Sequence, residues 1–577
     1  MVSILGLCRV GALSLAILAS LAPPALASAA RDLTEALRER LSTGVGIPVS
    51  DRDGQDLLII DGFYQNRGLT PIWVAPGGPT ERARALHAVL SGAGAEGLDP
   101  KDYGTARIGA LLDRGDSPDA LAELEILLTN AALDYGRDLG SGRLEPSRVD
   151  PELFVERREV DAAKLLVGAA DAVDIGGFLG RFAPTRPEYV RLREALKGYR
   201  ELAKAGGWKA IPGGEPLKPG MVDPRVAALR ARLAATNELP MGELPEGEPP
   251  ADPNLYDEIV ERGVRAFQRR HGIEPDGAVG RRTLAELNAT PGQRIQQIIL
   301  NMERWRWMPD DLGPRYLAVN LADYTLAVMQ GNEVVDTMRV VVGAPYTRTP
   351  VFSGSMTYLE LNPYWHVPPK IAKEELLPKV KKDPGYLAKE GYTLLSDWSE
   401  SAVPVDPKSI DWKSIGPNQF RWRVRQDPGA KNALGRIKFM FPNRFDVYLH
   451  DTPSKSHFER AMRSFSHGCI RVQDPPRLAL AIMGITETAG WTPESLAEAI
   501  DAGTRRVVKL RKPLPVHITY ITAFVDGDGA VQFRGDVYGR DKLLALALHA
   551  AHTVWPDASG KGAPGKAPPS GVLSPAN

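Results

Sequence analysis

Cysteine is the residue type that this sequence has least of. The 577 residues contain two cysteines, Cys8 and Cys469, and Cys8 lies in a largely apolar N-terminal segment. One thiol in the rest of the chain excludes internal disulfides there, so packing must hold the fold together. Excess charge is also missing, because 71 Lys and Arg residues balance 71 Asp and Glu residues. Net charge therefore gives no reason to expect binding to nucleic acid or to anionic lipid.

Apolar runs long enough to cross a bilayer are missing beyond the N-terminus. Residues 1–29 contain Arg9, an apolar run over 10–21, and an Ala-Leu-Ala or Ala-Ser-Ala sequence of the kind that is cleaved. This pattern predicts a signal peptide over 1–29 and an exported, periplasmic protein without stable membrane insertion after cleavage. Residues 2–7 are also largely apolar, so an uncleaved anchor remains the alternative.

The thiol outside that segment lies among other reactive residues. Residues 450–471 read HDTPSKSHFERAMRSFSHGCIR, with His467 two residues before Cys469 and His450 nineteen before it. Cysteine attacks as a thiolate, so it needs a base or a cation nearby. His450 ends a mostly apolar, strand-like run and can face Cys469 from a neighbouring strand. We therefore predict Cys469, His450 and His467 as the catalytic residues, with His467 in a supporting role.

The residues beside the thiol suit an acyl substrate. Gly468 leaves space for a substrate carbonyl, and backbone N–H groups near Cys469 can stabilise the developing oxyanion. Arg471 offers a fixed fork for a carboxylate. Ser466 completes the predicted oxyanion and substrate-binding set at this motif.

Two other interpretations of the thiol remain open. A lone cysteine is often a small buried apolar residue. A zinc site is also conceivable, although its irregular spacing lacks the paired-ligand pattern of structural zinc modules, and its ligands would be His450, His457, His467 and Cys469. We predict no metal and no organic cofactor.

The motif resembles that of a known enzyme family. SHGCIRV, preceded by YLHDTP, is similar to the signature of the L,D-transpeptidases, bacterial cell-wall enzymes with a YkuD-type catalytic domain. The resemblance implies His450 as the base and Cys469 as the nucleophile. Asp451 departs from the family, which commonly has Gly there, so backbone freedom is restricted and a carboxylate is expected at the rim of the site.

The chain before the motif reads as helical. Residues 30–210 are predicted to form an all-α scaffold domain, and FYQNRGLTPIWV and GLDPKDYG resemble the scaffold of the larger family members. Residues 211–290 end in VRAFQRRHGIEPDGAVGRRTLAELN, which resembles a three-helix peptidoglycan-binding domain of type 1. Residues 217–290 carry ten basic and twelve acidic residues, which argues against a DNA-binding bundle and leaves a spacer as the alternative. A linker helix is predicted within 291–314.

The remainder reads as a mostly β catalytic domain over 315–510. Its predicted strands fall within 316–330, 333–343, 356–361, 419–425, 436–441 and 444–450. The charged insertion 368–418 is long for a loop inside a sheet, and the resemblance implies a lid over the catalytic groove. Residues 511–556 are expected to add strands and a helix, and 557–577 to be a disordered tail.

The segment NPYWHVP before the insertion also resembles the family. Trp365 and His366 are therefore predicted at the entrance of the groove, with ordinary packing as the alternative.

Together these features predict a multidomain α+β protein: an all-α scaffold, a three-helix peptidoglycan-binding domain and a mostly β catalytic domain with an inserted lid. The resemblance implies an L,D-transpeptidase that acts on peptidoglycan stem peptides, a tetrapeptide donor and a diamino-acid acceptor, and forms 3→3 cross-links. A carboxypeptidase or endopeptidase with the same residues and a non-catalytic wall-binding scaffold are the alternatives. The sequence does not indicate an oligomeric state.

Overall fold

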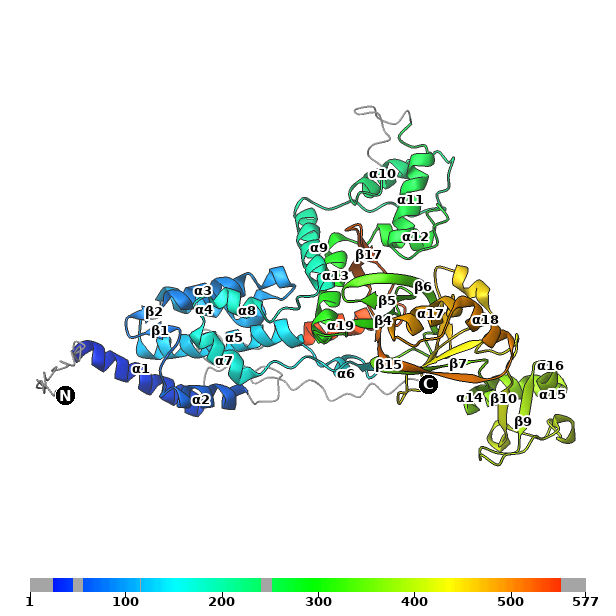
Figure 1. The fold of residues 1–577 in the computed structure, drawn as a ribbon. Coiled ribbons are helices and arrows are strands. Elements are labelled where there is room, and N and C mark those ends of the chain that lie inside the picture. The colour runs from blue at the N-terminus through cyan, green and yellow to red at the C-terminus, as the bar shows by residue number, and fades with distance from the viewer. Residues whose placement is uncertain (1–23, 45–55, 115, 240–251, 552–577) are drawn as a thin grey trace, which may run out of the picture.

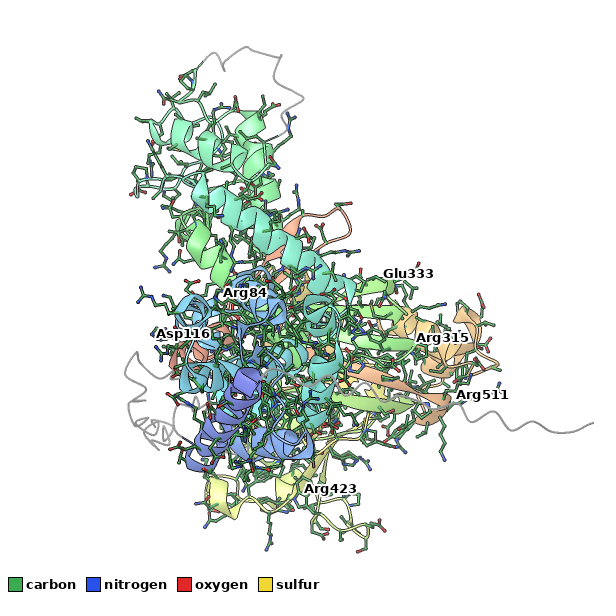
Figure 2. The ribbon with its side chains drawn as sticks, turned by 90° about the vertical axis from the view of Figure 1, so that its left-hand side faces the viewer. Arg84, Asp116, Arg315, Glu333, Arg423 and Arg511 are labelled. Carbon is green, nitrogen blue, oxygen red and sulfur yellow. The ribbon has the colours of Figure 1, made fainter. Side chains whose placement is uncertain are left out.

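The computed structural model describes residues 24–44, 56–114, 116–239 and 252–551. Helices fill the N-terminal end of the elongated molecule, and a large sheet lies toward the other end (Figure 1). Charged side chains such as Arg84, Glu333 and Arg511 lie on the outside (Figure 2). Most of the predicted signal peptide and the whole of the tail predicted at 557–577 lie outside the described ranges. Within them, no helix has the length and apolar character that a membrane span requires.

The N-terminal region is organised around helix α5 (Pro118–Ser141), which is buried along nearly its whole length. A helix buried on all sides is the core of its bundle. The surrounding helices are α1 (Pro24–Thr43), α2 (Asp56–Asn66), α3 (Glu81–Ser91), α4 (Thr105–Arg114), α6 (Pro146–Val149), α7 (Ala162–Asp171), α8 (Ile175–Gly180) and α9 (Pro187–Lys204). The region is not purely helical, because β1 (Val74–Ala75) and β2 (Gly78–Pro79) form a hairpin and β3 (Leu153–Phe154) joins the large sheet beside strand β7.

Three short helices form a separate small core. They are α10 (Arg225–Ala234), α11 (Glu258–Arg270) and α12 (Arg281–Leu287). Val226, Val260 and Phe267 are fully buried between them. The apolar face of this bundle is therefore used internally.

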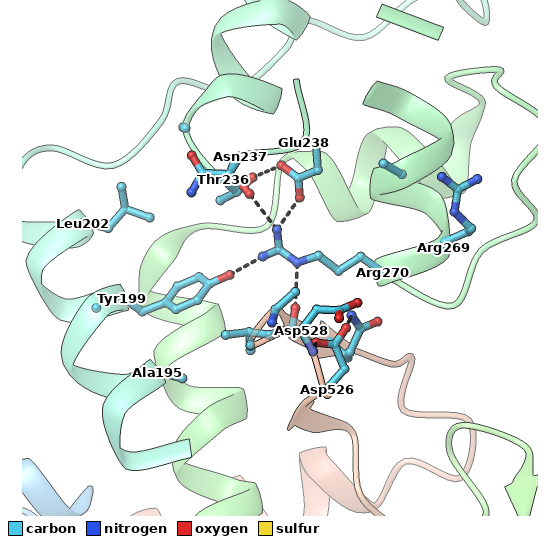
Figure 3. Close-up of a pocket in the computed structure, with 17 residues that line it drawn as sticks. Ala195, Tyr199, Leu202, Thr236, Asn237, Glu238, Arg269, Arg270, Asp526 and Asp528 are labelled. Atoms are coloured by element: carbon cyan, nitrogen blue, oxygen red, sulfur yellow. Dashed lines mark hydrogen bonds and ion pairs between the residues drawn. The ribbon is translucent and has the colours of Figure 1, made fainter. Parts of the chain in front are cut away.

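One arginine joins this bundle to two other parts of the chain. Arg270, at the end of α11, donates to Glu238 Oε1 (2.5 Å), to the Tyr199 hydroxyl on α9 (2.8 Å) and to the Val531 carbonyl (2.6 Å) (Figure 3). A cavity of about 800 Å³ surrounds these contacts. Buried charges are stable only when paired, so Arg270 fixes the small bundle on both neighbours.

Helix α13 (Pro291–Trp307) leads from the bundle to the sheet. Thr290 and Gln293 form a capping box at its start, which sets the first turn. Near its end Arg306 and Glu303 form a fully buried ion pair of 3.0 Å. The helix packs against α9 and α5 on one side and against β16 and α19 on the other, so it lies between the N-terminal helices and the sheet-containing part.

The large sheet has the order β11-β12-β14-β6-β5-β4-β15-β7-β3, and an additional β11–β7 pairing closes it on itself. Its strands are β4 (Arg315–Asn320), β5 (Thr325–Gln330), β6 (Glu333–Gly343), β7 (Val351–Leu361), β11 (Ile437–Met440), β12 (Leu449–His450), β13 (Ser464–Ser466), β14 (Ile470–Val472) and β15 (Arg506–Thr519). Closure removes exposed edges from the strands that carry the motif.

The strands expected within 316–330 and 333–343 meet as a hairpin of β5 and β6 around Gly331. The run 316–330 is two strands, not one, because a turn with Tyr324 at φ 57° separates β4 from β5. Helices α17 (Pro475–Ile485), α18 (Pro493–Asp501) and α19 (Arg540–Ala550) and hairpin β16 (Ala523–Val525) with β17 (Val531–Phe533) complete this part.

The insertion after β7 is a folded unit with its own core. Its elements are β8 (Trp365–His366), α14 (Pro369–Ile371), a π-helical turn (Ala372–Leu376), α15 (Leu377–Lys382), α16 (Tyr386–Lys389), β9 (Tyr392–Leu395) and β10 (Arg423–Gln426). The order β8-β10-β9 makes a sheet separate from the large one. The prediction of 419–425 as a strand of the main sheet is therefore wrong: Trp412 and Trp422 draw this segment into the core of the insertion.

Candidate active site

Cys469 lies directly before β14, beside the strand that carries His450. β12 and β14 are parallel, with His450 opposite Arg471. Tyr448, two residues before His450, lies beside Cys469. The Ile470 N–H donates to the Tyr448 carbonyl (3.1 Å). Because alternate residues of a strand share a face, Tyr448 and His450 point to the same side. Their rings lie 5.7 Å apart.

The predicted strand over 444–450 is wrong except at its end. Asp446 has φ 54°, and the Asn443 side chain donates to the Phe441 and Val447 carbonyls, both at 2.7 Å. A turn therefore replaces the first part of the strand. It places the Asp446 carbonyl 3.7 Å from Cys469 Sγ, which donates its S–H.

The thiol of Cys469 is held mainly in its neutral form. Burial raises the pKa of Cys469, while hydrogen bonds from the Tyr448 backbone and hydroxyl oppose that shift. The charges of Lys438 and Arg471 also oppose it. The two cations therefore favour the thiolate, whereas burial of the sulfur favours the neutral thiol.

His450 is oriented by its own backbone. Its side chain is buried, and Nδ1 donates to the Asp451 carbonyl. A carbonyl only accepts, so Nδ1 carries the hydrogen and Nε2 of the neutral ring is the free base. Burial, followed by the charge of Arg471, lowers the pKa of His450 to about 3. At neutral pH the site therefore contains a neutral thiol and a neutral imidazole.

His467 points toward the insertion. Its Nε2 lies 2.7 Å from Oε1 of Glu375, in the π-helical turn, and both side chains are about half exposed. The structure thus joins the predicted catalytic histidine to the inserted unit.

The SHGC loop is braced from within and from the β6–β7 connection. Ser466 Oγ donates to the Cys469 carbonyl and accepts from the Gly468 N–H (3.1 Å). Thr349 Oγ1 donates to the Gly468 carbonyl (2.8 Å), and Thr347 Oγ1 to the Ser466 carbonyl (2.9 Å). Gly468 has φ 117°, which side-chain-bearing residues rarely adopt. The Ser466 hydroxyl is thus engaged by the loop backbone.

Arg471 lies on the same face as the thiol. Its Nη1 is 3.5 Å from His457 Nδ1, and its Nε is buried without a hydrogen-bond partner among the described residues. Burial lowers the pKa of Arg471, and the nearby Cys469 opposes this. A buried donor without a partner costs free energy, so this side chain is suited to receive an anion.

The expectation of an Asp451 carboxylate at the rim is wrong. Asp451 is buried, and its carboxylate accepts from the Arg436 N–H (2.8 Å), the Thr452 N–H (2.7 Å) and the Lys455 ammonium (2.7 Å). Gly435 makes room for it, since a Cβ there would lie 2.3 Å from the Asp451 carboxyl carbon. Asp451 therefore braces the turn after His450 from the inside.

Trp365 and His366 lie in β8 of the insertion. Trp365 packs on the core of the insertion, with its ring 6.2 Å from that of Tyr392. His366 is only partly covered; this partial burial, followed by the charges of Arg423, Arg425 and Lys438, lowers its pKa. Of the two residues, only His366 is influenced by Lys438, which lies opposite His450 in the large sheet.

The four residues of the zinc alternative do not form a metal cluster. Within the described ranges, no group of three or more His, Cys, Asp and Glu side chains could hold a metal ion. His467 instead contacts Glu375, and His457 lies beside Arg471.

Sequence reasoning missed several residues of the site. Tyr448, two residues before His450, could have been found from strand alternation. Lys438 in β11 and Thr349 have no local signal, because only the pairing of distant strands brings them to the motif.

Three parts of the chain match known families. Residues 59–196 match a scaffold domain, 222–287 a peptidoglycan-binding domain and 314–508 the L,D-transpeptidase catalytic domain of the YkuD type. A Haemophilus influenzae protein assigned as a candidate L,D-transpeptidase is 35% identical over 252 residues, which are 44% of this chain and 49% of that protein. The chain thus spans about half the length of this curated relative.

Solved L,D-transpeptidases are distant in comparison. The enzyme from Mycobacterium smegmatis is 14% identical, covers 36% of this chain and 58% of its own, and gives a TM-score of 0.17. The one from Xylanimonas cellulosilytica is 15% identical, with coverages of 53% and 99% and a TM-score of 0.16. The domain assignment follows from the sequence matches. Residues 314–508 are an L,D-transpeptidase catalytic domain, which one chain combines with a scaffold domain and a peptidoglycan-binding domain.

Proposed function

We propose that this protein is a periplasmic L,D-transpeptidase that forms 3→3 cross-links in peptidoglycan through a thioacyl enzyme on Cys469. The observation that carries the proposal is the position of Cys469 directly before β14, beside the parallel strand β12 that carries His450, in the part of the chain that matches the L,D-transpeptidase catalytic domain. The free Nε2 of His450 supplies the base that a neutral thiol requires.

Acylation begins when Cys469 Sγ attacks the carbonyl carbon of the third residue of a donor tetrapeptide. The thiol proton passes to Nε2 of His450, and the bond to the terminal D-alanine breaks. His450 returns the proton to the leaving amine, and a thioester remains. Because burial raises the pKa of Cys469, we propose that proton transfer to His450 accompanies the attack.

Deacylation reverses these roles. The side-chain amine of a second stem attacks the thioester carbonyl, its proton passes to His450, and the sulfur leaves and is protonated again. Water in place of the amine would make the same site a carboxypeptidase or endopeptidase. We propose that the insertion limits this reaction by covering the thioester, which the contact of Glu375 with His467 supports.

The peptidoglycan-binding domain supplies affinity for the polymer in this proposal. Arg270 fixes that domain against the scaffold, so a bound strand would be held at a set position relative to the catalytic part. Pull-down with purified sacculi tests this role. Equal binding by the intact protein and by variants changed on the exposed face of α11 would reduce the domain to a spacer.

Purified protein and defined tetrapeptide muropeptides test the reaction, with products resolved by mass. Dimers linked between two third residues are the expected product. Trimmed monomers alone would establish a hydrolase, and unchanged muropeptides would establish a non-catalytic protein. Cell fractionation combined with the mass of the mature N-terminus tests export: a periplasmic protein that starts near residue 30 is expected, and a cytoplasmic full-length protein would contradict it.

A further inference from the structure

A row of polar residues crosses the sheet at the level of the candidate base. Strand pairing places Glu360 of β7 opposite Lys438 of β11, Lys438 opposite His450 of β12, and His450 opposite Arg471 of β14. Residues directly opposite one another in neighbouring strands share a face. The row therefore runs beside Cys469, and Lys438 is its member with no assigned role.

Lys438 places an ammonium group without an ion-pair partner, among the described residues, close to the residues around Cys469. Its Nζ lies 3.9 Å from the ring centre of Tyr448, the residue beside Cys469. Glu360, the carboxylate opposite it, forms an ion pair with Arg505 at 2.8 Å. Among the described residues, Lys438 itself has no ion pair, so its charge is not neutralised by direct contact.

We propose that Lys438 stabilises the Cys469 thiolate as it forms, and so sets the reactivity of the nucleophile. In the attack, the S–H bond breaks, its proton moves to Nε2 of His450, and the sulfur electron pair forms the S–C bond. A positive charge close to the sulfur lowers the free energy of this partly ionised state. Lys438 acts through the electrostatic field of its ammonium group and through its contact with the Tyr448 ring. It does not touch the reacting atoms, so it is a positioning residue and not a catalytic one.

The other charges around the thiol are accounted for. Arg471 and Lys438 both lower the pKa of Cys469, whereas its burial raises it. His450 is neutral and Tyr448 keeps its proton, because burial raises the pKa of Tyr448 well above its usual value. Neither of these two groups can replace a cation.

The charge of Lys438 is coupled to that of Cys469. Burial lowers the pKa of Lys438, and the charge of Arg505 acts in the same direction, whereas the charges of Glu360, Asp446 and Cys469 oppose this. The charge of Lys438 also acts on His366 of the insertion, on His450 and, by direct contact, on the Tyr448 ring. Formation of the thiolate strengthens the charge on Lys438, and the converse holds by linkage.

The test measures alkylation of Cys469 by iodoacetamide as a function of pH, in the full-length protein, by mass analysis of the peptide that contains Cys469. Lys438→Met should raise the midpoint of the pH profile by about one unit and slow alkylation about tenfold below that midpoint. Lys438→Arg should keep the midpoint near that of the wild type. Lys431→Met, a matched loss of an exposed lysine that pairs with Glu390, should also leave it unchanged.

An unchanged midpoint in Lys438→Met would overturn the proposal, because the charge of Lys438 would then have no effect on the thiol. Equal shifts in Lys438→Met and Lys438→Arg would also overturn it, because the effect would then be structural. If Lys438→Met does not fold, as judged by circular dichroism, Lys438→Gln takes its place. The proposal rests on the proposed nucleophile and not on the acceptor. A shifted midpoint without cross-linking would refute the transpeptidase function alone, and cross-linking with an unshifted midpoint would refute the role of Lys438 alone.

Discussion

The buried, neutral state of His450 predicts a specific pH dependence of stability. The pKa of His450 falls from 6.5 to about 3 because its ring is buried. When the pH falls below 6.5, the unfolded chain gains a proton at this position that the folded chain does not take up. The stability that this residue contributes is therefore complete above pH 6.5 and is lost as the pH falls toward 3.

The magnitude follows from the shift. Between pH 7 and pH 5, a group with pKa 6.5 in the unfolded chain and about 3 in the folded chain lowers the free energy of unfolding by about 2 kcal/mol. Replacement of His450 by Gln removes this proton and keeps a polar side chain of similar size. The wild type should thus lose about 2 kcal/mol more than His450→Gln over this pH range.

Urea unfolding at pH 7 and pH 5 measures this difference, with hydrogen exchange of the peptides that contain β12 and β14 as the readout of unfolding around His450. Other buried histidines, such as His271 and His517, also titrate abnormally, because burial lowers the pKa of each. They contribute equally to both proteins and cancel in the comparison. Identical pH dependence of wild type and His450→Gln would refute the neutral buried imidazole.

Three further changes test other parts of the structure. Arg270→Met leaves the buried Glu238 carboxylate without its ion-pair partner and should destabilise the small helical bundle by about 3 kcal/mol in urea unfolding. A loss below about 1 kcal/mol would contradict the role of Arg270 in holding the bundle in place. Glu375→Gln breaks the contact with His467 and should speed hydrogen exchange in the insertion. Global stability should fall by less than about 1 kcal/mol, because both side chains are half exposed. Unchanged exchange would show that the contact does not restrain the insertion. Gly468→Ala imposes φ 117° on a residue with a Cβ and should lower stability by about 1 to 3 kcal/mol in thermal unfolding, whereas full stability would show that the loop relaxes freely.

Local patterns were sufficient for the elements whose neighbours in the sequence decide their structure. The β5–β6 hairpin follows from alternation around a Gly-Asn turn, and the helices of the small bundle from their apolar faces. The SHGC motif identified Cys469 and His450 as candidates because the chemistry of a thiol needs a base close by.

Contacts between distant segments could not be predicted in this way. The opposition of Lys438 and His450 depends on the pairing of β11 with β12, and no periodicity fixes that register. The burial of Asp451 depends on space left by Gly435, sixteen residues earlier. The strand expected at 419–425 forms only over its last residues and belongs to the sheet of the insertion, because Phe420 and Trp422 pack into the core of that unit.

The most direct test of the central claim is a single-turnover reaction with a tetrapeptide muropeptide donor and no acceptor. The product is quenched in acid and located by mass analysis of peptides. The account predicts that the peptide containing Cys469 gains the mass of the donor minus the terminal D-alanine, and that Cys469→Ala carries no acyl group. An acyl group on a different residue, or D-alanine release by Cys469→Ala at the rate of the wild type, would contradict it.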